Sequence, residues 1–326
     1  MARVVLGLGS SHSPQLSTSP DLWPLHGERD KRNRGLLATN GTPITYEALL
    51  ETAPPSMAKE LTPETWQARY RACQQGISQL GETLTQVSPD FVVIIGDDQD
   101  ELFSDENMPA MLVYWGDTIL NHPHYADAAS PALRAAAWAY GPRAATYPVA
   151  AELGKHIIGC LIDAEFDIAH SRMLKPGRGM GHAFSFVYGR ILNGKSIPTV
   201  PIMVNTYYPP NQPTPKRCYD LGRAVRAAIE SWPSDARVAV VASGGLSHFV
   251  IDEELDHQVI KALQGKNAEA VYALPRKRLD SGTSEIRNWI VTAGAVEHLD
   301  MQLIDYVPCY RSPAGTGCAM AFAQWS

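Results

Sequence analysis

The stretch FVVIIGDDQDELF, residues 91–103, decides the fold that we expect for this chain. Its first five residues are β-branched or aromatic, and Pro89-Asp90 and Gly96 bound them, which is typical of a short strand buried on both faces. Acidic and amide residues follow directly at positions 97–101. Ligands commonly bind just past the carboxyl ends of such strands, where a cation, a hydrogen-bond network or open water makes crowded carboxylates tolerable. The stretch therefore predicts a buried strand that ends in a candidate site, with a solvated acidic loop as the alternative.

Helical and strand patterns alternate along most of the chain. Thr62-Pro63-Glu64 supplies an N-cap and a proline at the first helical position, and apolar residues then recur at helical spacing as far as Leu84. Residues 17–56 are rich in Pro, Gly, Asn and charge, and they predict a functional excursion or lid. Other expected elements are strands at 4–8, 110–115, 168–170, 199–205 and 238–242, and helices at 149–163 and 219–230. This alternation predicts an α/β fold: a single three-layer α/β/α domain around a mixed sheet, spanning residues 1–326.

Composition excludes several classes of protein. The 326 residues are 45% hydrophobic and 19% charged, as in ordinary globular proteins. The net charge of -6 does not indicate the basic surface that binds nucleic acid, so we expect no nucleic-acid partner. The N-terminal apolar run is too short for a secretory segment, and no run approaches 18 apolar residues, so we expect no membrane span and a cytoplasmic location. The five cysteines contain no C-x-x-C pair, which argues against a disulfide framework and a structural zinc site.

One motif match is misleading. Residues 189–196, GRILNGKS, fit the P-loop pattern, but phosphate binding needs a helix that starts at the lysine. Ile197-Pro198 and Pro201 follow instead and make that helix implausible. We therefore exclude nucleotide binding here and interpret Asn193-Gly194 as a hairpin turn.

Three histidines stand at positions where a side chain can be held at the mouth of a cleft. His12, His182 and His248 each follow an apolar strand or a glycine-rich turn. Each one alone is readily explained as a structural histidine. Together with the acids at 97–101 and 252–254, they supply the imidazole and carboxylate ligands of a non-haem Fe(II), Mn or Zn centre.

Five motifs in this order resemble the class III extradiol ring-cleavage dioxygenases, the family of the protocatechuate 4,5-dioxygenase β subunit. Within it, the chain is most similar to the 3-O-methylgallate dioxygenases. The resemblance runs from residue 1 to about residue 323. It rests on GSSHSP at 9–14, GDDQ with a downstream NMP at 96–109, GHAFS at 181–185, GGLSHF followed by DEELD at 244–256, and SGTSEIRNW at 281–289.

The resemblance implies roles for individual residues. In that family, two histidines and a glutamate hold Fe(II) on one face and leave open positions for a catecholate and O₂. His12 matches the first histidine, Glu254 the glutamate, and His182 the catalytic histidine. Ser281 matches a serine near the substrate carboxylate, and His248 and Gln99 are expected to contact the substrate as well.

The chain departs from the family at the second metal histidine, which falls on Asp100. An aspartate can coordinate a divalent metal through oxygen, so the expected ligands are His12, Asp100 and Glu254, with Asp97 and Asp98 as supporting groups or turn formers. Three interpretations stay open: an active dioxygenase with an unusual ligand, a metal protein with changed chemistry, and an impaired site.

The resemblance implies O₂-dependent meta-cleavage of a carboxylated catechol such as 3-O-methylgallate, gallate or protocatechuate. The expected cofactor is Fe(II), with Mn(II) or another divalent metal as alternatives, and the expected partners are the aromatic acid and O₂. A metal-dependent hydrolase or lyase on the same fold is the competing function, and a non-catalytic subunit that binds an aromatic acid is the third. A homodimer is the assembly that we take as the working expectation.

Overall fold

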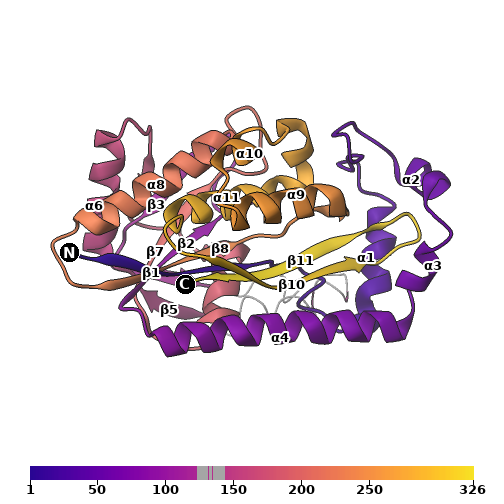
Figure 1. The fold of residues 1–326 in the computed structure, drawn as a ribbon, viewed down its shortest axis with the longest axis horizontal. Helices are drawn as coiled ribbons and strands as arrows, with labels where there is room; N and C mark the ends of the chain where they lie inside the picture. Colours follow the sequence, from indigo (N-terminus) through magenta and orange to yellow (C-terminus); the bar gives the residue numbers. More distant parts are fainter. Residues whose placement is uncertain (123–130, 132–133, 135–143) are drawn as a thin grey trace.

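The computed structural model describes residues 1–122, 131, 134 and 144–326 (Figure 1). Its centre is a nine-stranded mixed sheet in the order β10-β11-β1-β8-β2-β7-β3-β6, with β9 paired to β11. Its strands are β1 (Arg3–Ser10), β2 (Phe91–Gly96), β3 (Met111–Tyr114), β6 (Ala169–Ser171), β7 (Thr199–Val204), β8 (Arg237–Ser243), β9 (His248–Val250), β10 (Met301–Tyr310) and β11 (Thr316–Trp325). A separate two-stranded sheet pairs β4 (Thr118–Asn121) with β5 (Ala145–Pro148).

Four neighbouring strands in the middle of the sheet run parallel. β1 and β2 each pair in parallel with β8, and β2 also pairs in parallel with β7. Their carboxyl ends therefore meet at one edge of the sheet, where parallel α/β sheets commonly bind ligands. β2 is buried from Val92 to Gly96, which confirms the strand predicted at 91–95.

Helices cover both faces of the sheet. In Figure 1, α4 runs beneath the strands, while α8, α9, α10 and α11 lie above them. The helices are α1 (Trp23–Asp30), α2 (Tyr46–Thr52), α3 (Met57–Glu60), α4 (Pro63–Val87), α6 (Ala151–Asp163), α7 (His182–Phe186), α8 (Pro215–Ser231), α9 (Glu253–Gln264), α10 (Ala268–Tyr272) and α11 (Ile286–Ala295). Short helical turns are η1 (Pro20–Leu22), η3 (Val187–Ile191), η4 (Arg276–Leu279) and η5 (Ser281–Glu285). None of the helices described is long and apolar enough to cross a membrane.

The two faces of β2 contribute to two different cores. Val93 and Ile95 belong to the core beneath α6, α8, α9 and α11, whereas Val92 and Ile94 pack with the buried face of α4. This alternation is the period-2 geometry of a strand that is covered on both sides. The three layers confirm the predicted fold class.

Most local predictions are confirmed, and two differ from the structure. Helix α4 starts as expected, with the Thr62 side chain accepting a hydrogen bond from the backbone N–H of Thr65. Asn193-Gly194 forms a turn, but it joins η3 to β7 rather than two strands, so the hairpin prediction is wrong. No helix starts at Lys195, which agrees with the exclusion of a P-loop. The sequence pattern also did not predict the long β10–β11 pair.

A close approach at Gly9 fixes how the end of β1 meets α11. A Cβ atom at Gly9 would lie 2.5–2.9 Å from three ring atoms of Trp289. That indole is fully buried and donates a hydrogen bond to the Gly244 carbonyl at 2.7 Å, so it cannot move freely. We expect Gly9→Ala to destabilise the protein by about 1–3 kcal/mol through overpacking, measured by chemical denaturation. Gly159→Ala is the control, since nothing lies within 4 Å of its added Cβ; equal effects would contradict the packing argument.

Candidate metal centre

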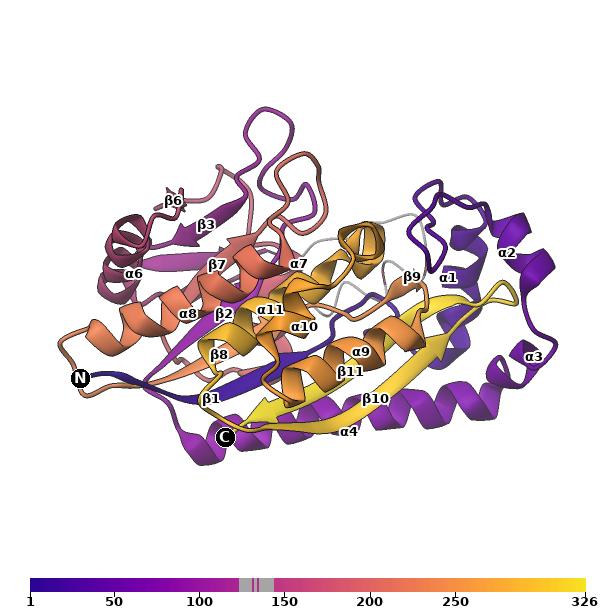
Figure 2. The same cartoon turned by 45° about the horizontal axis from the view of Figure 1, so that its top comes forward.

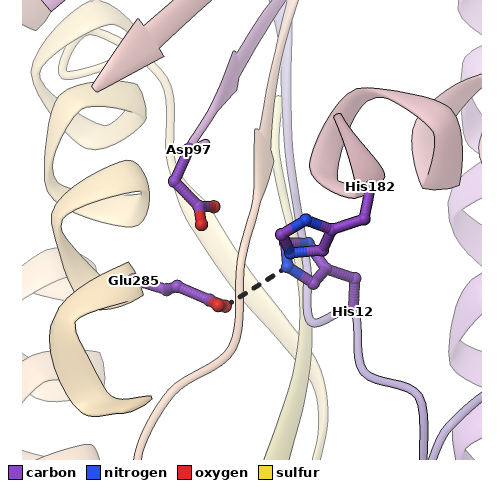
Figure 3. Close-up of side chains that lie close together, drawn as sticks. All are labelled: His12, Asp97, His182 and Glu285. Carbon is purple, nitrogen blue, oxygen red and sulfur yellow. Dashed lines mark ion pairs between the residues drawn. The ribbon is translucent and has the colours of Figure 1, made fainter. Parts of the chain in front are cut away.

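Four side chains with metal-binding atoms converge at the carboxyl edge of the parallel strands. His12, Asp97, His182 and Glu285 each offer one ligand atom, and these atoms all lie within 4.8 Å of one another (Figure 3). His12 follows β1 and Asp97 follows β2, while His182 begins α7 and Glu285 ends η5. The strands therefore bring together residues that lie far apart in the chain.

The hydrogen bonds of His12 fix which of its nitrogens carries the proton. The Ser243 hydroxyl donates its hydrogen to the Ala183 carbonyl at 2.6 Å, so its oxygen accepts from His12 Nδ1 at 3.0 Å. In the neutral ring, His12 Nε2 therefore carries a lone pair, and this atom is buried and without a hydrogen-bond partner. It faces the Glu285 carboxylate at 3.4 Å. Two electron-rich atoms this close call for a positive charge, which a metal ion can supply.

Glu285 is one of two fully buried acids in the cluster. Its Oε2 accepts a hydrogen bond from the Gly245 N–H at 2.5 Å, and its Oε1 accepts one from Gln99 Nε2 at 2.9 Å. Burial by itself would raise the pKa of Glu285, but the positive charges that His12 and His248 carry in their protonated forms outweigh it and hold the pKa well below its usual range. Glu285 is therefore an ionised carboxylate in the cluster.

Asp97 differs from Glu285 in its ionisation. Burial and the negative charge of Glu285 raise the pKa of Asp97 to about 6. Asn288 Nδ2 donates to Asp97 Oδ1 at 3.0 Å, and Gln99 Nε2 lies 3.3 Å from Oδ2. Gln99 thus links the two carboxylates through one amide group. A cation in the cluster would relieve the repulsion between these acids.

His182 is held by a carboxylate on its far side. Glu101 accepts hydrogen bonds from both the backbone N–H and Nδ1 of His182, each at 2.8 Å. Burial lowers the pKa of His182, but the charge and hydrogen bond of Glu101 outweigh it and raise the pKa to about 10. His182 therefore holds a proton at neutral pH, and its ring lies 4.6 Å from that of His12, centroid to centroid.

His248 lies on the other side of Glu285. Its Nδ1 donates to the Leu246 carbonyl at 2.9 Å, and its Nε2 lies 3.4 Å from Glu285 Oε1. Burial lowers the pKa of His248, while Glu285 raises it more strongly, to about 9. His248 is therefore a cation paired with Glu285.

A cavity of about 450 Å³ opens in front of the cluster. Its lining includes His12, His182, His248, Gln99 and Glu285. The structure therefore brings all three histidines predicted from the sequence, together with Gln99, to the same cavity as Glu285.

The structure does not bring Asp100 and Glu254 to this cluster. Asp100 is exposed and has a positive φ of 62°, which turns it to a separate surface hollow beside Tyr208 and Asn211. Glu254 is exposed on α9, where it accepts a hydrogen bond from Gln258 Nε2 at 3.0 Å. Neither carboxylate shares a centre with His12, so the expected ligand set of His12, Asp100 and Glu254 does not fit this geometry.

Ser281 also lies elsewhere than expected. Its hydroxyl donates to the Gly35 carbonyl at 2.6 Å and ties η5 to the segment after α1. It is absent from the described lining of the cavity. The expected contact between Ser281 and a substrate carboxylate therefore does not agree with this arrangement.

Sequence reasoning missed two acids of the cluster. Asp97 was expected only as a supporting group, although it is the first residue after a buried strand. Glu285 lies in SGTSEIRNW, one of the motifs that carry the family resemblance, but that resemblance assigns a role only to Ser281. One sequence feature could have identified Glu285: it is an acid that directly precedes the buried helix α11.

Comparisons with known proteins match this sequence to one family and to two curated relatives. A family model described as the catalytic LigB subunit of aromatic ring-opening dioxygenase matches residues 47–314. A gallate dioxygenase from Pseudomonas putida is 41% identical over 106 residues, which make up 32% of this chain and 30% of that protein. A 2,3-dihydroxyphenylpropionate/2,3-dihydroxicinnamic acid 1,2-dioxygenase from Comamonas testosteroni is 29% identical over 177 residues, or 54% of this chain and 49% of that protein. The chain thus aligns with half or less of the length of these curated relatives.

Proposed function

Because the chain belongs to the family of catalytic LigB subunits of aromatic ring-opening dioxygenases, we propose that it opens the ring of a carboxylated catechol with O₂. The observation that carries this proposal is the convergence of His12, Asp97, His182 and Glu285 beside a cavity. Gallate, protocatechuate and 3-O-methylgallate are the candidate substrates, and Fe(II) is the proposed metal.

The ligand set that fits this proposal is His12, Asp97 and Glu285. His12 Nε2 is a buried lone pair with no hydrogen-bond partner, and its Nδ1–H is already bound by Ser243, as is usual for a metal-bound histidine. Two carboxylates complete a hard oxygen and nitrogen set, which suits Fe(II) or Mn(II). Asp97 and Glu285 replace Asp100 and Glu254 in the proposed set.

A metal bound there would supply a positive charge that makes the ring hydroxyls more acidic and an open position for O₂. His182 would hold and move a proton at Nε2, since Glu101 occupies its Nδ1. Glu101 orients His182 by accepting one hydrogen bond from its Nδ1 and one from its backbone N–H, and Gln99 holds the two carboxylates at their spacing. His248 would balance the charge of Glu285 and contact the bound ring.

The test of this function is oxygen consumption. We expect protein purified anaerobically and loaded with Fe(II) to consume about one O₂ per catechol opened, because both oxygen atoms enter the product. An oxygen electrode and the absorbance of the ring-opened product would be followed with protocatechuate, gallate and 3-O-methylgallate. Metal-free protein is the control.

Two results would overturn the dioxygenase assignment. Bound Fe(II) without oxygen consumption on any of these catechols would remove it. Metal-dependent turnover of an aromatic acid under anaerobic conditions would support the hydrolase or lyase alternative.

A further inference from the structure

The cavity in front of the metal cluster has two walls of opposite character. The acids Glu101 and Glu285 line it beside the cluster, and the ligand atom of Asp97 lies within 4.8 Å of that of Glu285. Its other wall comes from α1 and the turn that follows, through His26, Arg29, Arg32 and Asn33. Figure 2 shows α1 at the end of the molecule where β10 and β11 turn. A ligand in this cavity therefore lies between an acidic interior and a basic segment.

Arg311 lines the cavity, but its charge is already used. Its Nε and Nη2 donate to the two oxygens of Asp30 at 2.7 and 2.8 Å, and its Nη1 donates to Gln15 Oε1 at 3.0 Å. Arg311 and Asp30 are both buried. This bidentate pair is a satisfied structural contact that leaves no free positive charge for a ligand.

His26 lines the same wall and is neutral. The Thr18 hydroxyl donates its hydrogen to the Gln15 carbonyl at 3.1 Å, so His26 Nε2 donates to the Thr18 oxygen at 3.2 Å. Burial, followed by the charges of Arg311 and Arg29, lowers the pKa of His26 to about 3. Its remaining nitrogen, Nδ1, is an acceptor and would repel an anion.

The two cationic histidines of the lining, His182 and His248, are each paired with an acid. His182 is held by Glu101 at 2.8 Å, and His248 lies 3.4 Å from Glu285. Each of these charges is balanced inside the cluster. An anionic group that entered this region would also meet the carboxylates of the proposed metal site.

Arg29 and Arg32 are the cations that stay available. Both line the cavity and are exposed, and neither guanidinium has an ion pair or hydrogen bond with a residue that the structure describes. Lys31, between them, is held by Glu28 at 2.7 Å and does not line the cavity. They lie three residues apart at the end of α1, which allows two guanidinium groups to approach one ligand.

We propose that Arg29 and Arg32 bind the carboxylate of the aromatic substrate. Guanidinium groups recognise carboxylates through charge-assisted, often bidentate hydrogen bonds. Glu101 and Glu285 repel the carboxylate of the substrate. The ring therefore enters with its hydroxyls toward the cluster and its carboxylate toward α1. This inference rests on the proposed function, and it assigns to Arg29 and Arg32 the role that the sequence had suggested for Ser281.

The experiment compares two ligands that differ only in the carboxylate. Protein loaded with Fe(II) is titrated anaerobically with 3,4-dihydroxybenzoate and with unsubstituted catechol, and both Kd values are measured by calorimetry. We expect Arg29→Gln and Arg32→Gln each to weaken 3,4-dihydroxybenzoate relative to catechol by about 10-fold, the scale of one hydrogen bond between charged groups. Arg34→Gln is the matched control, because Arg34 is an exposed neighbour that lines a different hollow.

The possible outcomes separate this inference from the proposed function. An unchanged Kd ratio in the double variant R29Q/R32Q, with oxygen consumption intact, would overturn the carboxylate site alone. If the Kd of 3,4-dihydroxybenzoate rises relative to that of catechol in the arginine variants, but the wild type consumes no oxygen, the site is supported and the dioxygenase is refuted. A rise of equal size in Arg34→Gln would show a general effect of surface charge and would also overturn the inference.

Discussion

His12→Ala is expected to lower bound divalent metal from about one equivalent to below about a tenth, since a three-ligand set that loses its only imidazole holds metal weakly. Its Nε2 is a buried nitrogen with no hydrogen-bond partner among the described residues. Glu285→Ala should have the same effect, because the carboxylate faces that nitrogen at 3.4 Å. Metal content after anaerobic loading and gel filtration measures both effects, and circular dichroism checks that the variants are folded.

The matched controls are the two acids that the family resemblance suggested. Glu254→Ala and Asp100→Ala should each retain a full equivalent of metal, because both carboxylates are exposed and lie outside the cluster. Loss of metal in Glu254→Ala with retention in Glu285→Ala would refute the proposed ligand set and restore the original one.

His182→Ala is expected to lower kcat by about 10²–10⁴-fold, the usual contribution of a positioned general acid or base. Metal content should not change, because His182 is assigned to proton transfer and the other three residues of the cluster to the metal. Glu101→Gln should give a smaller loss and shift the pH profile of kcat to lower values, since Glu101 is the group that raises the pKa of His182 to about 10. Steady-state oxygen consumption across pH, together with metal analysis, measures both variants.

A histidine outside the cavity provides the control for this experiment. His257 is exposed on α9, where its Nδ1 donates to the Glu253 carbonyl and its ring packs against Tyr306, and it is not among the described residues that line the cavity, so His257→Ala should keep full turnover. If His182→Ala loses metal along with activity, His182 is a ligand and its assignment to proton transfer is wrong.

The parts of the fold that sequence predicted well are those that local chemistry dictates. The start of α4 follows from Thr62 and Pro63, and β2 follows from a β-branched run closed by Gly96. Strand β11 escaped prediction because TGCAMAFAQW is rich in small residues with low strand propensity. Its neighbours β1, β9 and β10 hold it in place, and such partners are set by tertiary structure.

The candidate site was only partly predictable for a related reason. His12 follows the end of a strand and His182 follows a glycine-rich loop. Both features are visible in the sequence, so the sequence predicted these two positions. Glu285 ends a five-residue 3₁₀ turn, which is too short to show a periodic pattern in the sequence, and its partner His12 lies near the other end of the chain. Glu254 fitted a motif pattern, yet α9 turns it to the exposed face. Motif spacing thus indicated the family, whereas the direction of each carboxylate required the fold.

The hydroxyl of Ser243 constrains how this site can evolve. It orients His12 through its oxygen and holds the backbone carbonyl of Ala183 through its hydrogen, next to His182. A mutation that removes the hydroxyl would remove both hydrogen bonds, so it would affect the orientation of His12 and the backbone next to His182 at the same time. New substrate preferences within the lineage would therefore arise more readily on the α1 wall, where Arg29 and Arg32 can change without moving either histidine.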